Sequence, residues 1–174
     1  MYRNDFIVDK ITNSIEDVVI GKKYDTEVLP ITSTDLKIVL KKNRWHFNWR
    51  TEFKNHESEV YKLVIKNDRI VQGLISLKHD DKYIEMPLIE VAPHNYGKSK
   101  KYVGVAGNLV AYACKMSFSM GFGGVVGFKA KTKLIQHYIN TLGAEIIFKD
   151  RMSINEIAAK KLVNSYYKNY FDGK

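Results

Sequence analysis

The sequence has little cysteine, little proline and no long apolar run, and each absence excludes a class of protein. The single cysteine, Cys114, cannot form an internal disulfide, and only three prolines in 174 residues argue against long linkers. No apolar stretch approaches the roughly 18 to 20 residues that a membrane-spanning helix needs. The N-terminus also lacks the apolar core of a secretory signal. We therefore expect a soluble, cytoplasmic protein with no membrane partner.

Metal ligands are sparse as well. The five histidines are dispersed, and none stands in the His-x-x-His or Cys-x-x-Cys spacing that is typical of zinc sites. Cys114 lies among small and apolar residues of an expected helix, so we interpret it as a packed core thiol rather than a nucleophile. The sequence therefore predicts no metal site.

Positive charge is what the sequence has in excess. Lys and Arg number 28 against 19 Asp and Glu, which gives a formal net charge of +9 and a pI near 9.4. This charge favours an anionic partner, for which nucleic acid, an acidic membrane surface and a polyphosphate cofactor all fit. The hydrophobic share of 45% is typical of globular proteins, so we expect one domain over residues 1–174.

The middle of the chain is rich in β-branched and aromatic residues. Three such runs, at 60–65, 70–77 and 83–91, are separated by short polar turns and predict three consecutive antiparallel strands. Pro87 has no amide hydrogen to donate, so it marks a bulge or an unpaired position in the third strand.

Helical periodicity appears on either side of these strands. One or two helices are expected over 34–54, with Trp45 and Trp49 as core or lid residues. Ser153-x-x-Glu156 has the form of a capping box and predicts the start of the last helix. After the three strands we expect a helix at 104–120, a strand at 124–130, a helix at 132–142, a strand at 144–148 and a helix at about 153–170. This order predicts a mixed α/β fold.

A loop rich in glycine and lysine, residues 93–103, precedes the expected helix at 104–120. The first amides of a helix lack intrahelical partners and the helix dipole is positive there, so this position suits an anion. Gly104 and Ala106 have no bulky side chain to keep a phosphate from the backbone. The lysines that add charge nearby are Lys98, Lys100 and Lys101.

A nucleotide-binding motif overlaps the same loop. Ala92-x-x-x-x-Gly97-Lys98-Ser99 matches a relaxed form of the P-loop, whose strict form begins with glycine. The strands upstream are expected to be antiparallel, and no strand downstream ends in an aspartate suited to magnesium. The context therefore makes a P-loop nucleotide-binding protein the weaker alternative.

Two segments together resemble a known superfamily. Lys101-Tyr-Val-Gly104-Val-Ala106 resembles the Gln/Arg-x-x-Gly-x-Gly/Ala pyrophosphate loop of the GNAT N-acetyltransferases, with Lys in place of the usual first residue. The run from Lys131 to Ala144 is similar to the superfamily's Asn-x-x-Ala-x-x-x-Tyr-x-x-x-Gly-Phe segment, although Thr132 stands near the place of the asparagine. The resemblance covers about residues 26–148 and implies a largely antiparallel sheet flanked by helices on both faces.

The resemblance also implies a reaction: transfer of an acetyl group from acetyl-CoA directly to a primary amine. The strand corresponding to 88–91 is expected to separate from its neighbour and to expose its backbone to the pantetheine arm, while the amides at 103–106 bind the pyrophosphate. The residues implied in cofactor binding are Ile89, Val91, Lys101, Val103, Gly104, Val105, Ala106 and Thr132.

Two residues are the candidates for the chemistry. Glu90, at the end of the strand before the loop, is placed to act as a base directly or through a water. Strict alternation puts Glu85 on the opposite face, and His94 in the loop is a further possible base. Tyr138 matches the superfamily's thiolate-protonating tyrosine, but it precedes Gly143 by five residues. The usual spacing is four residues, which would select Ile139 instead.

The neighbouring His137 is expected to point about 100° away from Tyr138, so that one of the two faces away from the site. Three alternatives stay open for the acceptor: a small molecule, a protein and an RNA-linked amine. A homodimer also stays an alternative. A non-catalytic CoA-binding module and a basic nucleic-acid-binding module are the non-enzymatic alternatives. The second rests on the interleaved lysines and tyrosines of the C-terminal segment, which are suited to base stacking: Lys160, Lys161, Tyr166, Tyr167, Lys168 and Tyr170.

Overall fold

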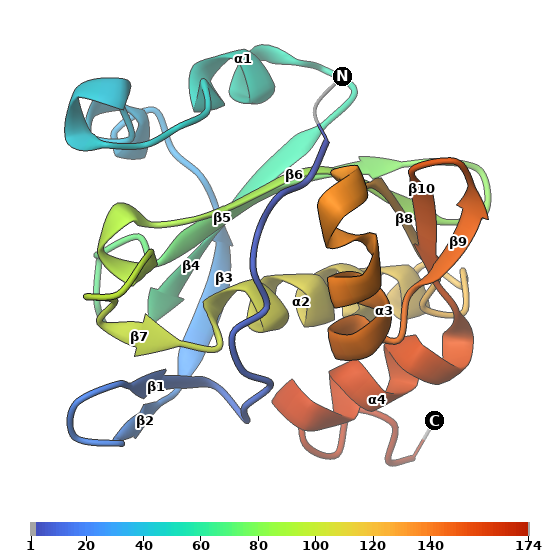
Figure 1. Ribbon diagram of the computed structural model, residues 1–174. Coiled ribbons are helices and arrows are strands. Elements are labelled where there is room, and N and C mark those ends of the chain that lie inside the picture. The colour runs from blue at the N-terminus through green and yellow to red at the C-terminus, as the bar shows by residue number, and fades with distance from the viewer. Residues whose placement is uncertain (1–2, 174) are drawn as a thin grey trace.

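A seven-stranded sheet forms the centre of the structure, a computed structural model that describes residues 3–173 (Figure 1). Its strands are β3 (Thr26–Pro30), β4 (Glu59–Ile65), β5 (Gly73–His79), β6 (Ile84–Val91), β8 (Val126–Lys129), β9 (Glu145–Phe148) and β10 (Arg151–Ile154). Their order in the sheet is β3-β4-β5-β6-β8-β10-β9. Every neighbouring pair is antiparallel except β6 and β8, which run parallel. This is the mixed, largely antiparallel sheet that the sequence predicts.

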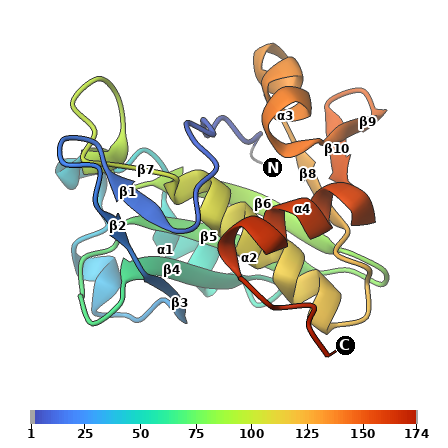
Figure 2. The same ribbon diagram turned by 90° about the horizontal axis from the view of Figure 1, so that it is seen from below.

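Helices cover both faces of the sheet (Figure 2). One face carries α1 (Trp49–Lys54), preceded by the 3-10 turns η1 (Asp35–Lys37) and η2 (Lys41–Asn43), and the other carries α2 (Val105–Ser119) and α4 (Glu156–Tyr166). The remaining elements are η3 (Pro93–Asn95), η4 (Thr132–Leu134), α3 (Ile135–Leu142) and a small sheet of β1 (Ile15–Asp17), β2 (Lys23–Tyr24) and β7 (Tyr102–Val103). Within residues 3–173, none of the helices has the length and apolar character needed to cross a bilayer.

Two hydrophobic cores lie on the two faces of the sheet. The larger packs the sheet against α2, α3 and α4 and includes Leu109, Phe128 and Tyr138. The smaller lies under α1 and contains Trp45 and Trp49, which are 7% and 1% exposed, so their interpretation as core residues is confirmed. Cys114 is buried in the larger core, and its burial raises the pKa of the thiol, as the interpretation of a packed core cysteine requires.

The three-stranded meander β4-β5-β6 is confirmed, and so is the irregularity at Pro87. Ser76 pairs with Leu88, but Lys78 pairs with Glu85, so Leu77 alone faces two residues of β6. This bulge resets the alternation of β6. Glu85 and Glu90 consequently lie on the same face of the sheet, beside α1, which corrects the expectation from strict alternation.

The expectation of one or two helices over 34–54 is largely wrong. Only α1, with six residues, is an α-helix; η1 and η2 are single 3-10 turns. The chain is extended at Leu40 and left-handed at Arg44, with φ of 71°, and these two residues interrupt any continuous helix. Trp45 and Trp49 reach the core from this broken segment, so packing decides its path rather than helix propensity.

The capping box at Ser153 is also wrong. Ser153 lies in β10, where it pairs with Gly127 of β8, and the N-cap of α4 is Asn155, whose Oδ1 accepts a hydrogen bond of 2.9 Å from the amide of Ala158. The alternating burial of Met152 and Ile154 is the period-2 signal of the strand that the capping motif obscured. The helix ends at Tyr166 rather than near residue 170.

The two candidate N-caps of α4, Asn155 and Ser153, predict different effects of mutation on the stability of the protein. Replacing Asn155 by Ala removes the cap of α4 and is expected to lower the free energy of unfolding by about 1 kcal/mol. Ser153→Ala is the matched control and is expected to change it by less than about 0.5 kcal/mol. Urea denaturation monitored by circular dichroism measures both; a larger loss for Ser153→Ala would restore the capping box.

Candidate functional site

The parallel strands β6 and β8 pair over a short distance only. Ile84 pairs with Val126 and Glu85 with Gly127, and beyond these two pairs the strands no longer bond to each other. The loop after β6 leads to the N-terminus of α2, and α3 follows β8. The gap between β6 and β8 is therefore bordered by two strand edges, a helix N-terminus and a second helix.

The N-terminal arm, which we define as residues 3–14, runs through this gap. In Figure 1 it is the dark blue chain that passes between β6 and α3. Its residues alternate in burial as those of a strand do: Asn4, Phe6 and Val8 are 1%, 5% and 5% exposed, whereas Ile7 is 46% exposed. Sequence reasoning missed this element, because residues 4–8 read Asn-Asp-Phe-Ile-Val and show no alternation of polar and apolar residues.

Asn4 connects the two strands across the gap. Its side-chain Oδ1 accepts a hydrogen bond of 3.1 Å from the amide of Ile89, and its Nδ2 donates bonds of 3.1 Å to the carbonyls of Met86 and Lys129. Its backbone amide donates to the carbonyl of Lys129 at 2.8 Å, and its carbonyl accepts from the amide of Lys131 at 3.0 Å. The backbone edge of β6 that was expected to bind the pantetheine of acetyl-CoA is therefore bound to the N-terminal arm.

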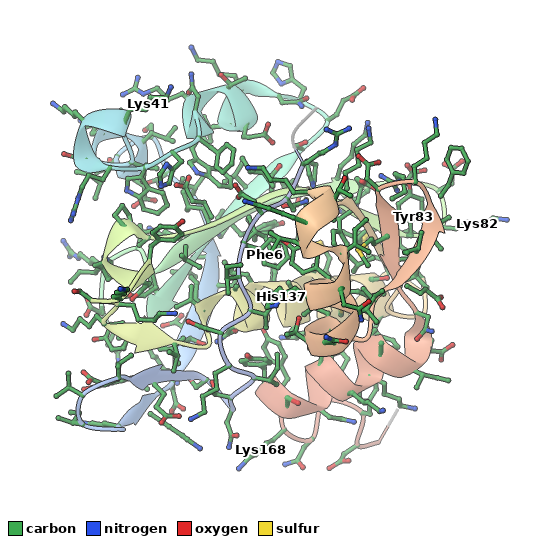
Figure 3. The ribbon with its side chains drawn as sticks, viewed as in Figure 1. Phe6, Lys41, Lys82, Tyr83, His137 and Lys168 are labelled. Atoms are coloured by element: carbon green, nitrogen blue, oxygen red, sulfur yellow. The ribbon has the colours of Figure 1, made fainter. Side chains whose placement is uncertain are left out.

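Two neighbouring residues of α3 hold the next part of the arm. Tyr138 is fully buried, and its hydroxyl donates a hydrogen bond of 2.8 Å to the carbonyl of Phe6. The centres of the Tyr138 and Phe6 rings lie 4.8 Å apart. The Nε2 atom of His137 accepts a bond of 3.0 Å from the amide of Val8 (Figure 3). The expectation that one of the two faces away is wrong, because the arm runs along the helix and meets both.

The hydroxyl of Tyr138 carries its proton at neutral pH. Burial, with a smaller contribution from the negative charge of Asp5, raises the pKa of Tyr138 far above its usual range. The inward position of Tyr138, one residue earlier than the usual spacing before Gly143, makes it rather than Ile139 the buried residue of this turn.

The N-terminus of α2 binds a carboxylate of the arm. Gly104, with φ of 91°, donates a backbone hydrogen bond of 3.0 Å to Oδ1 of Asp9, and Oδ2 of Asp9 lies 3.1 Å from the ammonium of Lys100. This is the anion site predicted from the loop, but the anion belongs to the same chain. A Cβ at Gly104 would lie 2.6 Å from Oγ1 of Thr12, so glycine is required for the close approach of the arm.

The other residues implied in cofactor binding are distributed around the gap. The backbone of Val103 pairs with Glu16 in the small sheet, and Val91 pairs with Gly73 of β5. Lys101 places its ammonium 5.4 Å from the ring centre of Tyr102. Val105 and Ala106 are buried in the first turn of α2, and Thr132 is exposed at the start of η4. Their roles stay predictions.

The relaxed P-loop is not supported by the position of its residues. Lys98 and Ser99 lie in the loop several residues before Val105, where α2 begins, so the lysine is not at a helix start. The C-terminal tyrosines do not form a free stacking surface either. The hydroxyl of Tyr166 accepts a bond of 3.3 Å from the amide of Thr12, and the ring of Tyr167 packs 4.2 Å from the ammonium of Lys115.

A cavity of about 1120 Å³ lies on the other side of the arm. We call it the β6 cavity. Its walls are the arm, from Asp5 to Asp9, the segment 41–47, the end of β6 and the loop 93–100. Three exposed cations, Lys41, Arg44 and Lys98, stand on these walls. Among residues 3–173, no cluster of three or more His, Cys, Asp or Glu is placed to hold a metal ion.

Glu90 lies in this cavity and anchors its wall. The carboxylate is 6% exposed and accepts hydrogen bonds of 2.7 Å from the amide of His46 and 2.8 Å from Nε1 of Trp49. A third, longer bond comes from the amide of Phe47. His94, the alternative base, does not line the cavity: its ring bonds to Gln72, and burial, together with the charge of Lys101, lowers its pKa.

Glu90 is therefore expected to contribute to stability as well as to the site. In Glu90→Gln one carboxylate oxygen becomes an NH2 group, which cannot accept a hydrogen bond from the backbone or indole N–H that faces it, so the free energy of unfolding is expected to fall by about 1–3 kcal/mol. The control is Glu145→Gln on the exposed strand β9, for which no loss is expected. Equal unfolding midpoints in urea would contradict the anchoring role.

Comparison with known proteins agrees with this architecture. No family model and no curated protein matches the sequence. Among solved structures, mutant forms of the spermidine/spermine N-acetyltransferase SpeG from Vibrio cholerae align with a TM-score of 0.55 and 14% identity, over 78% of this chain and 96% of that one. The same enzyme in complex with CoA and spermine aligns with a TM-score of 0.52 and 15% identity, over 78% and 98%. The chain therefore has the fold of the GNAT N-acetyltransferases, as the motifs at 101–106 and 131–144 imply.

Proposed function

We propose that the protein is an N-acetyltransferase that transfers an acetyl group from acetyl-CoA to a primary amine. The observation that carries the proposal is the separation of the parallel strands β6 and β8 beside the N-terminus of α2. The two strand edges there do not pair with each other and lie next to an anion site, which is the combination that an extended ligand with a phosphate group can use. The shared fold supports the same reading.

The arm determines whether this site can accept a cofactor. Asn4, Phe6 and Asp9 fill the gap from the strand edges to the amide of Gly104, so acetyl-CoA does not fit beside the docked arm. The proposal therefore requires a conformation in which the arm has left. In that conformation the amides of Ile89 and Gly104 lose their present acceptors and face the gap.

The chain's own residues then offer specific groups. Tyr138 presents a protonated hydroxyl whose present acceptor, the carbonyl of Phe6, has gone. Acetyl-CoA would supply the activated acyl group. The β6 cavity is the space for the acceptor amine, and Glu90 keeps the segment 46–49 in place as its wall. We assign Glu90 a positioning role, because its carboxylate already accepts three N–H groups.

The charges of the β6 cavity bear on the acceptor. Lys41, Arg44 and Lys98 are exposed around it and belong to no ion pair found within residues 3–173. Such a rim attracts negative charge and repels a polycation. We therefore propose an acceptor amine on a molecule that carries negative charge elsewhere, in contrast to the spermine present in one SpeG complex.

This proposal can be tested with peptides of equal length that share one N-terminal residue and differ only in charge. Release of the CoA thiol from acetyl-CoA is expected to be fastest with the acidic peptide and slowest with the basic one. Lys98→Glu is expected to reduce the preference about fivefold, equivalent to about 1 kcal/mol for one surface charge pair. A preference for the basic peptide or for spermidine would overturn the assignment of the acceptor.

Tyr138→Phe tests the role of the hydroxyl. It keeps the aromatic ring in the core, so acetyl-CoA binding is expected to persist while turnover falls about 100-fold, a typical loss for a missing proton donor. The matched control is Tyr112→Phe, whose ring packs 5.3 Å from that of Tyr61 on another part of the sheet. Equal turnover in the two variants would remove Tyr138 from the chemistry, and no binding of acetyl-CoA to any variant would remove the proposed function.

A further inference from the structure

We propose that the N-terminal arm is an autoinhibitory segment that competes with the acyl donor for the gap between β6 and β8. This inference rests on the proposed function, because it concerns the regulation of the same site. Three contacts of the arm carry it, one at each part of the gap: at the strand edges, at α3 and at the N-terminus of α2. Each of them satisfies a group that an extended anionic ligand would otherwise satisfy.

The first contact replaces a strand. The side-chain amide of Asn4 has one acceptor and one donor group, as a peptide unit does, and it pairs with the amide of Ile89 and the carbonyl of Met86 on one edge of β6. Its Nδ2 and its backbone bind the other side at Lys129 and Lys131. The amides of Ile89 and Lys131 each have a single hydrogen to donate, so no second ligand can use them while Asn4 is in place.

The second and third contacts extend the occupancy along the gap. Phe6 places its carbonyl on the hydroxyl of Tyr138, and its ring packs against Tyr138 and Phe128. Asp9 places a carboxylate on the first free amide of α2, with Lys100 as counter-ion. Along its sequence the arm therefore places a polar side chain at the strand edges, then an apolar ring at α3 and then a carboxylate at the N-terminus of α2.

The way the arm is attached allows it to leave. It forms a single isolated bridge, between Asn4 and Ala130, and no continuous ladder with either strand. Four of its contacts are ion pairs between partly exposed side chains: Arg3–Asp150, Asp5–Lys131, Asp9–Lys100 and Lys10–Glu16. Residues 3–14 contain no strand of the seven-stranded sheet, so release of the arm breaks none of the pairing between its strands. The burial of Phe6 and Val8 favours the docked state.

Competition of this kind has a quantitative consequence. When only a fraction of the molecules has the gap open, the apparent dissociation constant of a ligand equals the intrinsic constant divided by that fraction. A change that weakens the docked arm without touching the open gap must therefore tighten binding in proportion. The arm itself must become more accessible as the ligand binds.

The first experiment measures hydrogen exchange in the unmodified full chain with and without saturating acetyl-CoA. The amides of Asn4, Val8 and Thr12 are bonded in the docked arm and are expected to exchange at least about tenfold faster with the ligand. The amides of Ile89 and Gly104 are expected to stay protected, because the ligand replaces Asn4 and Asp9 as their acceptor.

The second experiment compares two asparagines of the arm by isothermal titration of the full chain with acetyl-CoA. Asn4→Ala removes the side-chain bonds to both strands and is expected to lower the apparent dissociation constant about tenfold. Asn13→Ala is the matched control, since its side chain is exposed and has no hydrogen bond in the described structure, and no change is expected.

The outcomes separate the inference from the proposed function. Acetyl-CoA that binds while the arm stays protected, with equal affinity for the unmodified chain and Asn4→Ala, overturns autoinhibition and leaves the enzyme proposal intact. Acetyl-CoA that binds neither the unmodified chain nor Asn4→Ala overturns both, because the gap is then a permanent part of the core. Faster exchange in the arm together with tighter binding to Asn4→Ala supports the inference.

Discussion

The backbone groups left unpaired where β6 and β8 separate are the constraint on which the rest of the site depends. Two parallel strands that pair through only two residue pairs leave donors and acceptors along their remaining edges. Such groups are unfavourable when buried without partners, so another element has to supply them. Asn4 does so with a side chain that reproduces the hydrogen-bonding groups of a peptide unit, which explains why a polar residue with 1% exposure is stable there.

The positive groups at the other end of the gap also require a partner. The N-terminus of α2 presents the amide of Gly104, and Lys100 stands beside it, so an anion is favoured at this point. Asp9 fills the position from within the chain. Part of the excess positive charge of the sequence thus lies at this site, and its anionic partner in this conformation is a carboxylate of the arm.

The sequence predicted the elements whose signals are local and missed those that depend on distant contacts. The meander β4-β5-β6, the bulge at Pro87 and the helix after Gly104 follow from alternation, proline chemistry and glycine position, and all are present. The arm could not be placed in the same way, because residues 4–9 acquire their partners from β6, β8 and α3, more than 80 positions away. Before α4, the motif Ser153-x-x-Glu156 predicted a helix start, but Ser153 lies in β10, where pairing with Gly127 of β8, a residue distant in the sequence, decides its structure.

One wall separates the two halves of the proposed site. Phe6 packs against Tyr138 on one side and lines the β6 cavity, which contains Glu90, on the other. Asp5 and Asp9 also belong to both the arm and the cavity wall. Departure of the arm would therefore do more than free the strand edges: it would join the gap to the cavity and bring the Tyr138 hydroxyl and the acceptor space into one volume. Access for the donor and formation of the complete site are then consequences of the same movement, so a molecule with a docked arm would lack both.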